Sequence, residues 1–120
     1  NINYKEHLIF LKKLEKTSYK KYFLLVKNNE NLGVIYFTNI TTNSCKFGLY
    51  GIKKGVGNLL MEEIKNYAFN VLKIQNLNAC VFKENIKALN LYLKHGFNIV
   101  NENDEFYFVN LNNPNRNVVF

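Results

Sequence analysis

The sequence predicts an α/β (α+β) protein built on a mixed, mostly antiparallel sheet flanked by helices. Three observations lead to this fold class. A hairpin pattern occupies the first half of the chain, a glycine-containing loop then separates a strand from a helix, and a further strand and helix follow. Hairpins give antiparallel pairs and a strand–helix–strand crossover gives a parallel pair, so one sheet should hold both kinds. A chain of 120 residues allows one domain with a real core, so 1–120 is expected to be a single domain.

The first half of the chain is predicted to be a helix followed by three strands. Apolar residues recur at helical spacing and predict an amphipathic helix over 3–16: Tyr4, Leu8, Leu11 and Leu14. Tyr22–Lys27 and Leu32–Asn39 are rich in β-branched and aromatic residues and flank a run of turn formers, which predicts a hairpin. Cys45–Tyr50 is expected to be another short strand.

The second half alternates helices and strands. Leu60, Ile64 and Ala68 share one helical face, which predicts a helix from Asn58 to about residues 72–75. The apolar run Leu77–Phe82 predicts a central strand that is covered on both faces. The remaining expected elements are a helix over Asn85–His95, a strand pair Phe97–Val100 and Glu105–Leu111, and a frayed tail over 112–120.

Composition and charge restrict the function classes. The net charge is +7, but the lysines are scattered rather than gathered into one stripe, so we expect no nucleic-acid partner and favour phosphorylated ligands. No apolar run approaches the ~20 residues that cross a bilayer, and the N-terminus lacks a signal-peptide layout. We therefore expect no membrane partner and a cytoplasmic protein. Cys45 and Cys80 have no metal-ligand spacing and are each expected to be small buried hydrophobes.

The segment Gly51–Gly57 lies between a predicted strand and a predicted helix. Glycines let the backbone approach a ligand closely, and free N–H groups at a helix N-terminus favour an anion, so this loop is a candidate phosphate or pyrophosphate cradle. It is neither a dinucleotide fingerprint nor a Walker loop, because the third glycine and the Gly-Lys-Ser/Thr run are missing. An ordinary tight turn remains the alternative.

The segment Asn85–Phe97 carries the most informative pattern, Asn-x-x-Ala-x-x-x-Tyr-x-x-x-Gly-Phe. Asn85 suits a helix cap, and Gly96 suits a helix end. This pattern resembles the last conserved block of the GNAT N-acetyltransferase superfamily. The order of strand, glycine loop, helix, strand and Asn85 helix is also that of the superfamily.

The resemblance implies acetyl-coenzyme A as cosubstrate and no metal. Its thioester would lie where Cys45–Tyr50 splays from Leu77–Phe82, and Tyr92 would donate a proton to the departing thiolate. Tyr92 otherwise reads as a helix aromatic that packs on the sheet. The resemblance implies these coenzyme contacts: Leu49, Tyr50, Ile52, Lys54, Gly55, Val56, Gly57, Asn58, Asn85 and Lys94.

Some of these residues have equally good structural roles. Asn85 could simply cap its helix, and Lys94 could be a solvated side chain. No general base is assigned, since Glu84, His7 and His95 are each only candidates and water could relay the proton.

Several stretches resemble one subgroup of the superfamily, the N-acetyltransferase of pseudaminic acid biosynthesis. They include Glu6–Leu8, Phe47–Tyr50, Lys54–Gly57 and Val81–Asn85. The subgroup acetylates the 4-amino group of a UDP-linked amino-sugar that is used for flagellin glycosylation. The family's first strand and helix have no counterpart here, so the chain is expected to be N-terminally truncated. Ile52 also occupies the position of the family's usual Gln or Arg, and the loop after it is shorter.

These observations leave alternatives to a nucleotide-sugar N-acetyltransferase. One is a protein or small-amine acetyltransferase of the same fold. Another is an inactive remnant that acts only as a binding module, and a basic nucleic-acid binder ranks third. A homodimer that replaces the missing strand is a further expectation.

Overall fold

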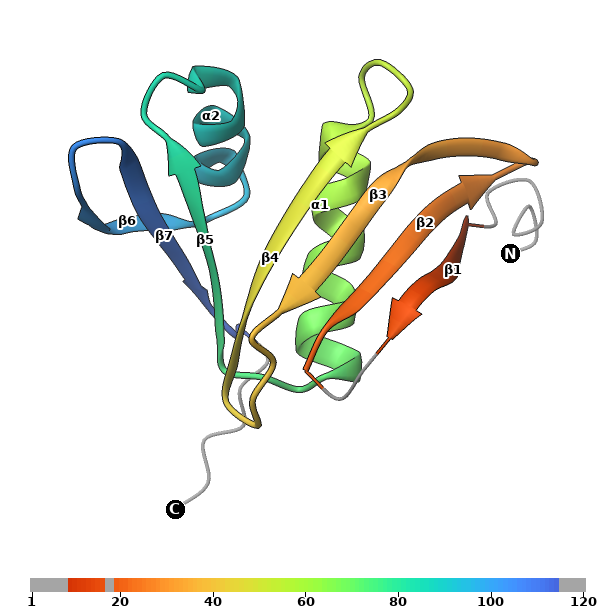
Figure 1. Ribbon diagram of the computed structural model, residues 1–120, viewed down its shortest axis with the longest axis horizontal. Coiled ribbons are helices and arrows are strands. Elements are labelled where there is room, and N and C mark those ends of the chain that lie inside the picture. The colour runs from red at the N-terminus through yellow and green to blue at the C-terminus, as the bar shows by residue number, and fades with distance from the viewer. Residues whose placement is uncertain (1–8, 17–18, 115–120) are drawn as a thin grey trace.

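The protein is described here from a computed structural model that covers residues 9–16 and 19–114. Within these residues the strands form one seven-stranded sheet in the order β1-β2-β3-β4-β5-β7-β6 (Figure 1). All neighbouring strands run antiparallel except β4 and β5, which are parallel. The predicted fold class is therefore confirmed. The strands are β1 Ile9–Lys16, β2 Lys21–Lys27, β3 Glu30–Thr38, β4 Ser44–Gly51, β5 Asn76–Phe82, β6 Asn98–Glu102 and β7 Phe106–Asn112.

The start of the described chain differs from the sequence prediction. Ile9–Lys16 forms β1, which pairs antiparallel with β2 from Ile9 opposite Lys27 to Lys16 opposite Lys21. The predicted helix over 3–16 is thus wrong over 9–16, and its first part lies outside the described residues. The apolar spacing of this short segment does not decide between helix and strand, and pairing satisfies the backbone groups of β2 that would otherwise lie at a sheet edge.

The hairpin of β2 and β3 is confirmed. Asn28 and Asn29 form its two-residue turn with φ angles of 51° and 66°, a left-handed backbone that asparagine tolerates well. β4 follows as the next antiparallel strand and pairs with β3 along Gly33–Thr38.

One face of this sheet is covered by α1, Gly57–Asn66, and by the π-helical segment η2, Tyr67–Val71, that continues it. In Figure 1, α1 lies behind β3 and β4. Leu60, Met61 and Ile64 are completely buried there and pack with the inward side chains of the strands. The predicted helix is confirmed, although its last turn is π-helical.

β5 contradicts two sequence expectations. Its side chains alternate, with Ala79 and Val81 buried and Cys80 and Phe82 exposed, so only one of its faces is covered at these positions. An apolar run predicts two covered faces only if layers exist on both sides, and here the described residues leave Cys80 and Phe82 exposed on the face away from α1. Cys45 is buried as expected, whereas the prediction of a buried Cys80 is wrong.

β4 and β5 stay together only at their beginnings. Their parallel pairing runs from Ser44 opposite Asn76 to Lys46 opposite Asn78 and then stops. Beyond these residues the two strands diverge, as Figure 1 shows for the yellow and green-cyan arrows. Two hollows lie beside these diverging ends, one lined by Leu49 and Gly51 of β4 and the other by Phe82 of β5, and together they are called the cleft here.

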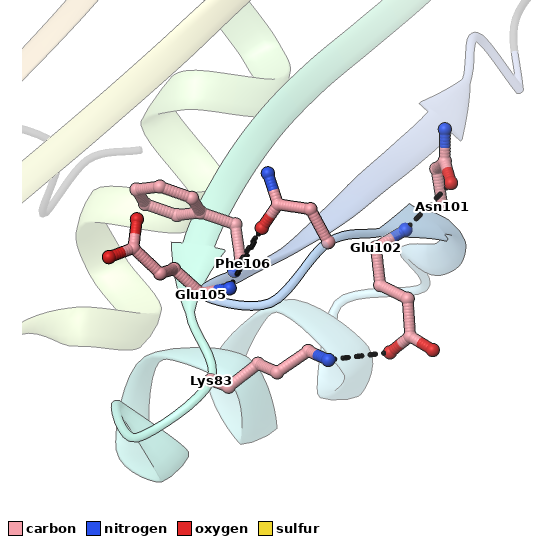
Figure 2. A network of polar contacts seen from close by, with 6 residues as sticks. Lys83, Asn101, Glu102, Glu105 and Phe106 are labelled. Carbon is pink, nitrogen blue, oxygen red and sulfur yellow. Dashed lines mark hydrogen bonds and ion pairs between the residues drawn. The ribbon is translucent and has the colours of Figure 1, made fainter.

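The helix α2, Ile86–Lys94, begins just after β5, and the β6–β7 hairpin follows it. An ion pair between Lys83 and Glu102 at 3.1 Å attaches the loop before α2 to this hairpin (Figure 2). The backbone N–H of Lys83 also donates to the Glu105 carbonyl. The amide oxygen of Asn103 closes the hairpin turn by accepting from the backbone N–H groups of Glu105 and Phe106. These contacts fix the start of α2 beside the cleft.

The described chain ends just after β7. Asn113 is buried, and its side-chain amide donates to the Ile74 carbonyl at 2.9 Å. Most of the predicted frayed tail, residues 115–120, lies outside the described residues. None of the described helices is both long and apolar enough to cross a membrane.

Candidate active site

An open pocket of about 560 Å³ lies where the end of β4, the start of α1 and α2 meet. Most of the residues predicted to contact coenzyme A line it: Leu49, Lys54, Gly55, Val56, Gly57, Asn58, Asn85 and Lys94. Segments that are about 30 residues apart in the sequence therefore come together at one place, as the strand order requires. Gly51 and Lys53 of the predicted cradle segment line the pocket too. Leu60, Lys87, Ala88, Asn90 and Leu91 also line it and were not predicted.

Several consecutive backbone N–H groups of the glycine loop and the first turn of α1 have no acceptor within the described protein. The N–H groups of Ile52 and Lys53 donate to the Leu32 carbonyl, which anchors the loop to β3. In the part of the chain that the structure describes, the N–H groups of residues 54–59 have no protein acceptor. Gly55 has a φ of +82°, a conformation that glycine adopts without strain, and a side chain there would meet nothing within 4 Å. The loop is shaped so that these N–H groups can be shared by an anion.

Four lysines surround the same donors: Lys53, Lys54, Lys87 and Lys94. Lys53 is paired with Glu30 at 2.8 Å, which connects the β2–β3 turn to the loop. Both side chains of this pair are about half exposed, so the pair contributes little to stability. The remaining lysines give the pocket mouth a positive potential that suits a multiply phosphorylated ligand.

The opposite wall of the pocket belongs to α2. The side chain of Asn85 caps this helix by accepting from the Ala88 N–H at 3.2 Å. A side chain at Gly57 would lie 3.3 Å from Leu91, so the small residue lets α1 and α2 approach closely. Leu49, Ala88 and Leu91 make the inner part of the pocket apolar, in contrast to its mouth.

Tyr92 lies deeper than the pocket lining, with only 7% of its surface exposed. Its ring packs against Phe47 of β4 and against Phe97, with a ring separation of 5.4 Å to Phe47. Burial raises the pKa of its hydroxyl to about 12, and Tyr36 and Cys80 add smaller electrostatic contributions in the same direction. Gln75 Oε1 is the buried side-chain polar atom without a partner among the described residues. The Tyr92 hydroxyl also has no hydrogen-bond partner among the described residues, but unlike Gln75 Oε1 it is not fully buried, so it reaches solvent-accessible space.

Tyr50 and Ile52 are not among the lining residues of this pocket. They are 57% and 55% exposed, respectively. Tyr50 follows the alternation of β4 and lies on the face away from α1. Ile52 belongs to the loop that the Leu32 carbonyl anchors.

Of the candidate bases, Glu84 lies with Phe82 and Asn85 around a second hollow of about 480 Å³. Asn85 therefore borders both spaces. His95 caps the end of α2, and its Nε2 lies 2.9 Å from Asn58 Oδ1 in the first turn of α1. Its pKa is lowered by burial and by Lys65, an effect that Glu62 partly offsets. His7 lies outside the described residues.

Comparisons with known proteins agree with this geometry. The family model of the acetyltransferase (GNAT) domain matches residues 4–115. The chain is 52% identical over 111 residues to acetyltransferase PseH of Campylobacter jejuni serotype O:2, which covers 91% of this chain and 71% of that protein. It is 53% identical over 110 residues to PseH of serotype O:23/36, which covers 90% of this chain and 70% of that protein.

Solved structures show the same relationship. The crystal structure of C. jejuni PseH in complex with acetyl coenzyme A matches with a TM-score of 0.78 at 52% identity and covers 80% of this chain and 70% of that one. Spermidine N-acetyltransferase from Vibrio cholerae in complex with CoA and spermine matches with a TM-score of 0.74, covering 80% of this chain and 67% of that one. At 19% identity, this second match shows the fold alone. The chain belongs to the GNAT family of acetyltransferases.

Proposed function

We propose that this protein is an N-acetyltransferase that moves the acetyl group of acetyl-coenzyme A directly to the 4-amino group of a UDP-linked amino-sugar. The reaction would serve pseudaminic acid biosynthesis and, through it, flagellin glycosylation. The observation that carries the proposal is the 52% identity to PseH, an acetyltransferase whose crystal structure was solved with acetyl coenzyme A. The pocket chemistry supports it independently.

The residues of the pocket fit acetyl-coenzyme A. Backbone N–H groups around Gly55 and Gly57 suit a pyrophosphate, because they point outward from a helix start without protein acceptors. Lys54, Lys87 and Lys94 suit the remaining phosphate charge at the mouth. Leu49, Ala88 and Leu91 suit the largely apolar pantetheine arm. The thioester would then lie in the cleft between β4 and β5, close to Tyr92.

The chemistry needs three things from the chain. The acceptor amine has to be neutral when it attacks the thioester carbonyl, so Glu84 or water has to accept its proton. Negative charge that develops on the carbonyl oxygen has to meet an N–H donor near the end of β4, a contact worth about 10²–10³ in rate. The departing sulfur has to meet a donor, and Tyr92 is our candidate.

The high pKa of Tyr92 restricts how it can act. At a pKa of about 12 its hydroxyl stays protonated at every working pH, so a donor is always present. Full proton transfer to a thiolate of ordinary pKa ~8.5 would be uphill by about 5 kcal/mol. We therefore propose that Tyr92 stabilises the sulfur by hydrogen bonding, while the ammonium formed on the acceptor supplies the proton.

Three finer points are proposals of the same kind. The acceptor is a nucleotide-sugar, the protein acts in the cytoplasm, where acetyl-coenzyme A is made available, and it can form a homodimer. A sedimentation experiment with the full chain would check the last point, since a monomer at all concentrations would contradict it.

The deciding experiment is calorimetric titration of the chain with acetyl-coenzyme A, followed by turnover with UDP-4-amino-4,6-dideoxy-N-acetyl-β-L-altrosamine. We expect binding on the order of micromolar Kd, release of free thiol, and a product that is heavier by one acetyl group. Spermidine serves as the matched control amine, because a related fold acetylates it. A folded sample that binds acetyl-coenzyme A but acetylates only the control would contradict the proposed acceptor.

A further inference from the structure

The cleft between β4 and β5 has a second side, which faces away from α1 and the coenzyme pocket. Ile35 and Phe37 point toward α1, since Phe37 contacts the ring of Tyr67 at 5.2 Å. Tyr36, between them, consequently points to the other face. Cys80 lies on that same face of β5, because its neighbours Ala79 and Val81 are buried.

Tyr36 reaches across β4 toward this cleft. It lies directly opposite Gly48 in the β3–β4 ladder, and a Cβ at Gly48 would be only 2.1 Å from both Cζ and Oη of Tyr36. Any other residue at position 48 would have to displace the ring. The glycine thus gives the Tyr36 hydroxyl a path over β4 toward β5.

The ring of Tyr36 is held in this position from the side. It stacks on Tyr22 of β2 at 5.0 Å with an angle of 15° between the planes. Lys20 Nζ lies 5.9 Å from the centre of the Tyr22 ring. A stacked pair on neighbouring strands restricts the ring, so the hydroxyl has few alternative positions.

Tyr36 of β3 and Cys80 of β5 lie on the face of the sheet away from α1, while Tyr92 of α2 approaches β4 from the α1 side. The ring of Tyr92 packs on the α1 side against Phe47, and small electrostatic contributions from Tyr36 and Cys80 add to the burial that raises the pKa of its hydroxyl. In this region β4 and β5 no longer pair, because their pairing stops after Lys46 and Asn78. Among the described residues, the hydroxyl of Tyr36 has no hydrogen-bond partner, although the residue is only partly exposed.

We propose that Tyr36 is an acceptor-binding residue, whose hydroxyl hydrogen-bonds the sugar on the side of the cleft opposite the coenzyme. The assignment rests on the proposed function, because it names a contact of the same reaction. Tyr22 and Gly48 are positioning residues for it. Tyr36 is not among the described residues that line the coenzyme pocket, so we expect its removal to affect the acceptor and not the coenzyme.

The test compares Tyr36→Phe with Tyr67→Phe. Both substitutions remove one hydroxyl from a partly buried tyrosine beside the same strands, but Tyr67 lies on the α1 side. The acetylation rate is measured while the concentration of the UDP-amino-sugar or of acetyl-coenzyme A is varied, which gives kcat and the KM for each substrate. We expect Tyr36→Phe to raise the KM for the sugar about 3- to 10-fold, the usual effect of one lost hydrogen bond, with kcat and the KM for acetyl-coenzyme A unchanged. Tyr67→Phe should leave all three unchanged.

Alkylation of Cys80 by iodoacetamide gives a second readout that needs no turnover. Cys80 is exposed, whereas Cys45 is buried with its pKa raised to about 12, so Cys80 reacts first. The sugar should protect Cys80 in the presence of coenzyme A, and Tyr36→Phe should raise the half-protecting sugar concentration by the same factor as KM. Gly48→Ala, which displaces the hydroxyl without removing it, should act in the same direction.

The outcomes separate the two proposals. If wild-type protein neither acetylates the sugar nor is protected by it, the proposed acceptor is wrong and the role of Tyr36 falls with it. If wild-type protein does both and Tyr36→Phe keeps the wild-type sugar KM and protection, only the role of Tyr36 is overturned. A loss of kcat with unchanged sugar KM would also overturn it, since that would indicate a structural effect on Tyr92.

Discussion

The N-termini of α1 and α2 border the same pocket, but a side chain caps only one of them. At α2, Asn85 accepts from the Ala88 N–H, so part of the helix end is already satisfied within the protein. At α1, the N-cap is Val56, no side chain caps the helix, and the loop before it adds further free N–H groups.

This difference assigns different tasks to the two helices. A helix N-terminus without a cap costs stability in isolation, and an anion that binds there recovers it. The N-terminus of α1 therefore suits the binding of phosphate charge. The capped helix α2 instead positions Tyr92 and the apolar residues that line the pocket. Changes at the N-terminus of α1 should alter coenzyme affinity, and a change at Tyr92 of α2 should alter turnover.

The largest effect is expected at Tyr92. Tyr92→Phe keeps the ring against Phe47 but removes the donor, so kcat should fall about 100-fold or more while the Kd for acetyl-coenzyme A changes little. Steady-state kinetics and calorimetry on the same sample measure both quantities, with Tyr67→Phe as the matched control. Because burial raises the pKa of Tyr92 to about 12, its ionisation should cause no loss of rate on the alkaline side up to about pH 10. If the kcat of Tyr92→Phe equals that of wild type at every pH measured, Tyr92 is excluded as the donor.

The next largest effect is expected at Gly55. A β-branched residue at its φ of +82° is strained by about 1–3 kcal/mol, so Gly55→Val should weaken acetyl-coenzyme A binding about 10- to 100-fold. Since nothing lies within 4 Å of the added Cβ, the effect would come from the backbone and not from a clash. Gly55→Asn is the control, because asparagine tolerates a left-handed backbone and should retain most of the affinity. Equal affinities for all three proteins would mean that the loop does not cradle the pyrophosphate.

Asn85 should show a smaller effect that separates its two roles. Asn85→Ala removes the cap of α2 and should lower the free energy of unfolding by about 1 kcal/mol, as measured by denaturant titration. Asn85→Ser keeps a capping oxygen and should restore that stability. If Asn85 also contacts the coenzyme, the Ser variant should still bind it more weakly than wild type. Wild-type affinity in the Ser variant would leave Asn85 with the structural role alone.

Much of the two helix ends could be predicted from the sequence, because local signals specify them. Asn85 and Gly96 mark α2, and the glycines mark the loop before α1. Ile9–Lys16 could not be assigned in this way, because its strand depends on pairing with β2, and the apolar spacing of the segment alone does not distinguish a strand from a helix. Cys80 was misassigned for a related reason, since an apolar run does not reveal which face of a strand is covered.

The residues of the site also fall into those that local sequence signals predict and those that only the fold reveals. The lining residues Lys54, Gly55 and Asn85 belong to recognisable motifs, whereas Lys87 and Asn90 belong to none and line the pocket because the fold brings α2 beside the glycine loop. Tyr36 had no sequence signal beyond the alternation of β3. Residues whose role depends on a gap between splayed strands have to be found in three dimensions.

The smallest effect is expected at His95, which joins the two helices. Its Nε2 contacts Asn58 of α1, and its ring is largely buried beside Glu62. Because its pKa is lowered in the folded protein, the unfolded chain takes up the proton first on acidification. Its contribution to stability is therefore complete above the unfolded pKa of about 6.5 and is lost progressively as the pH falls through the lower folded value. Denaturant titrations between about pH 7.5 and 5 should show stability falling less steeply in His95→Gln than in wild type. Gln keeps a donor for Asn58, so identical slopes would show that the contact between the helices does not depend on the charge of His95.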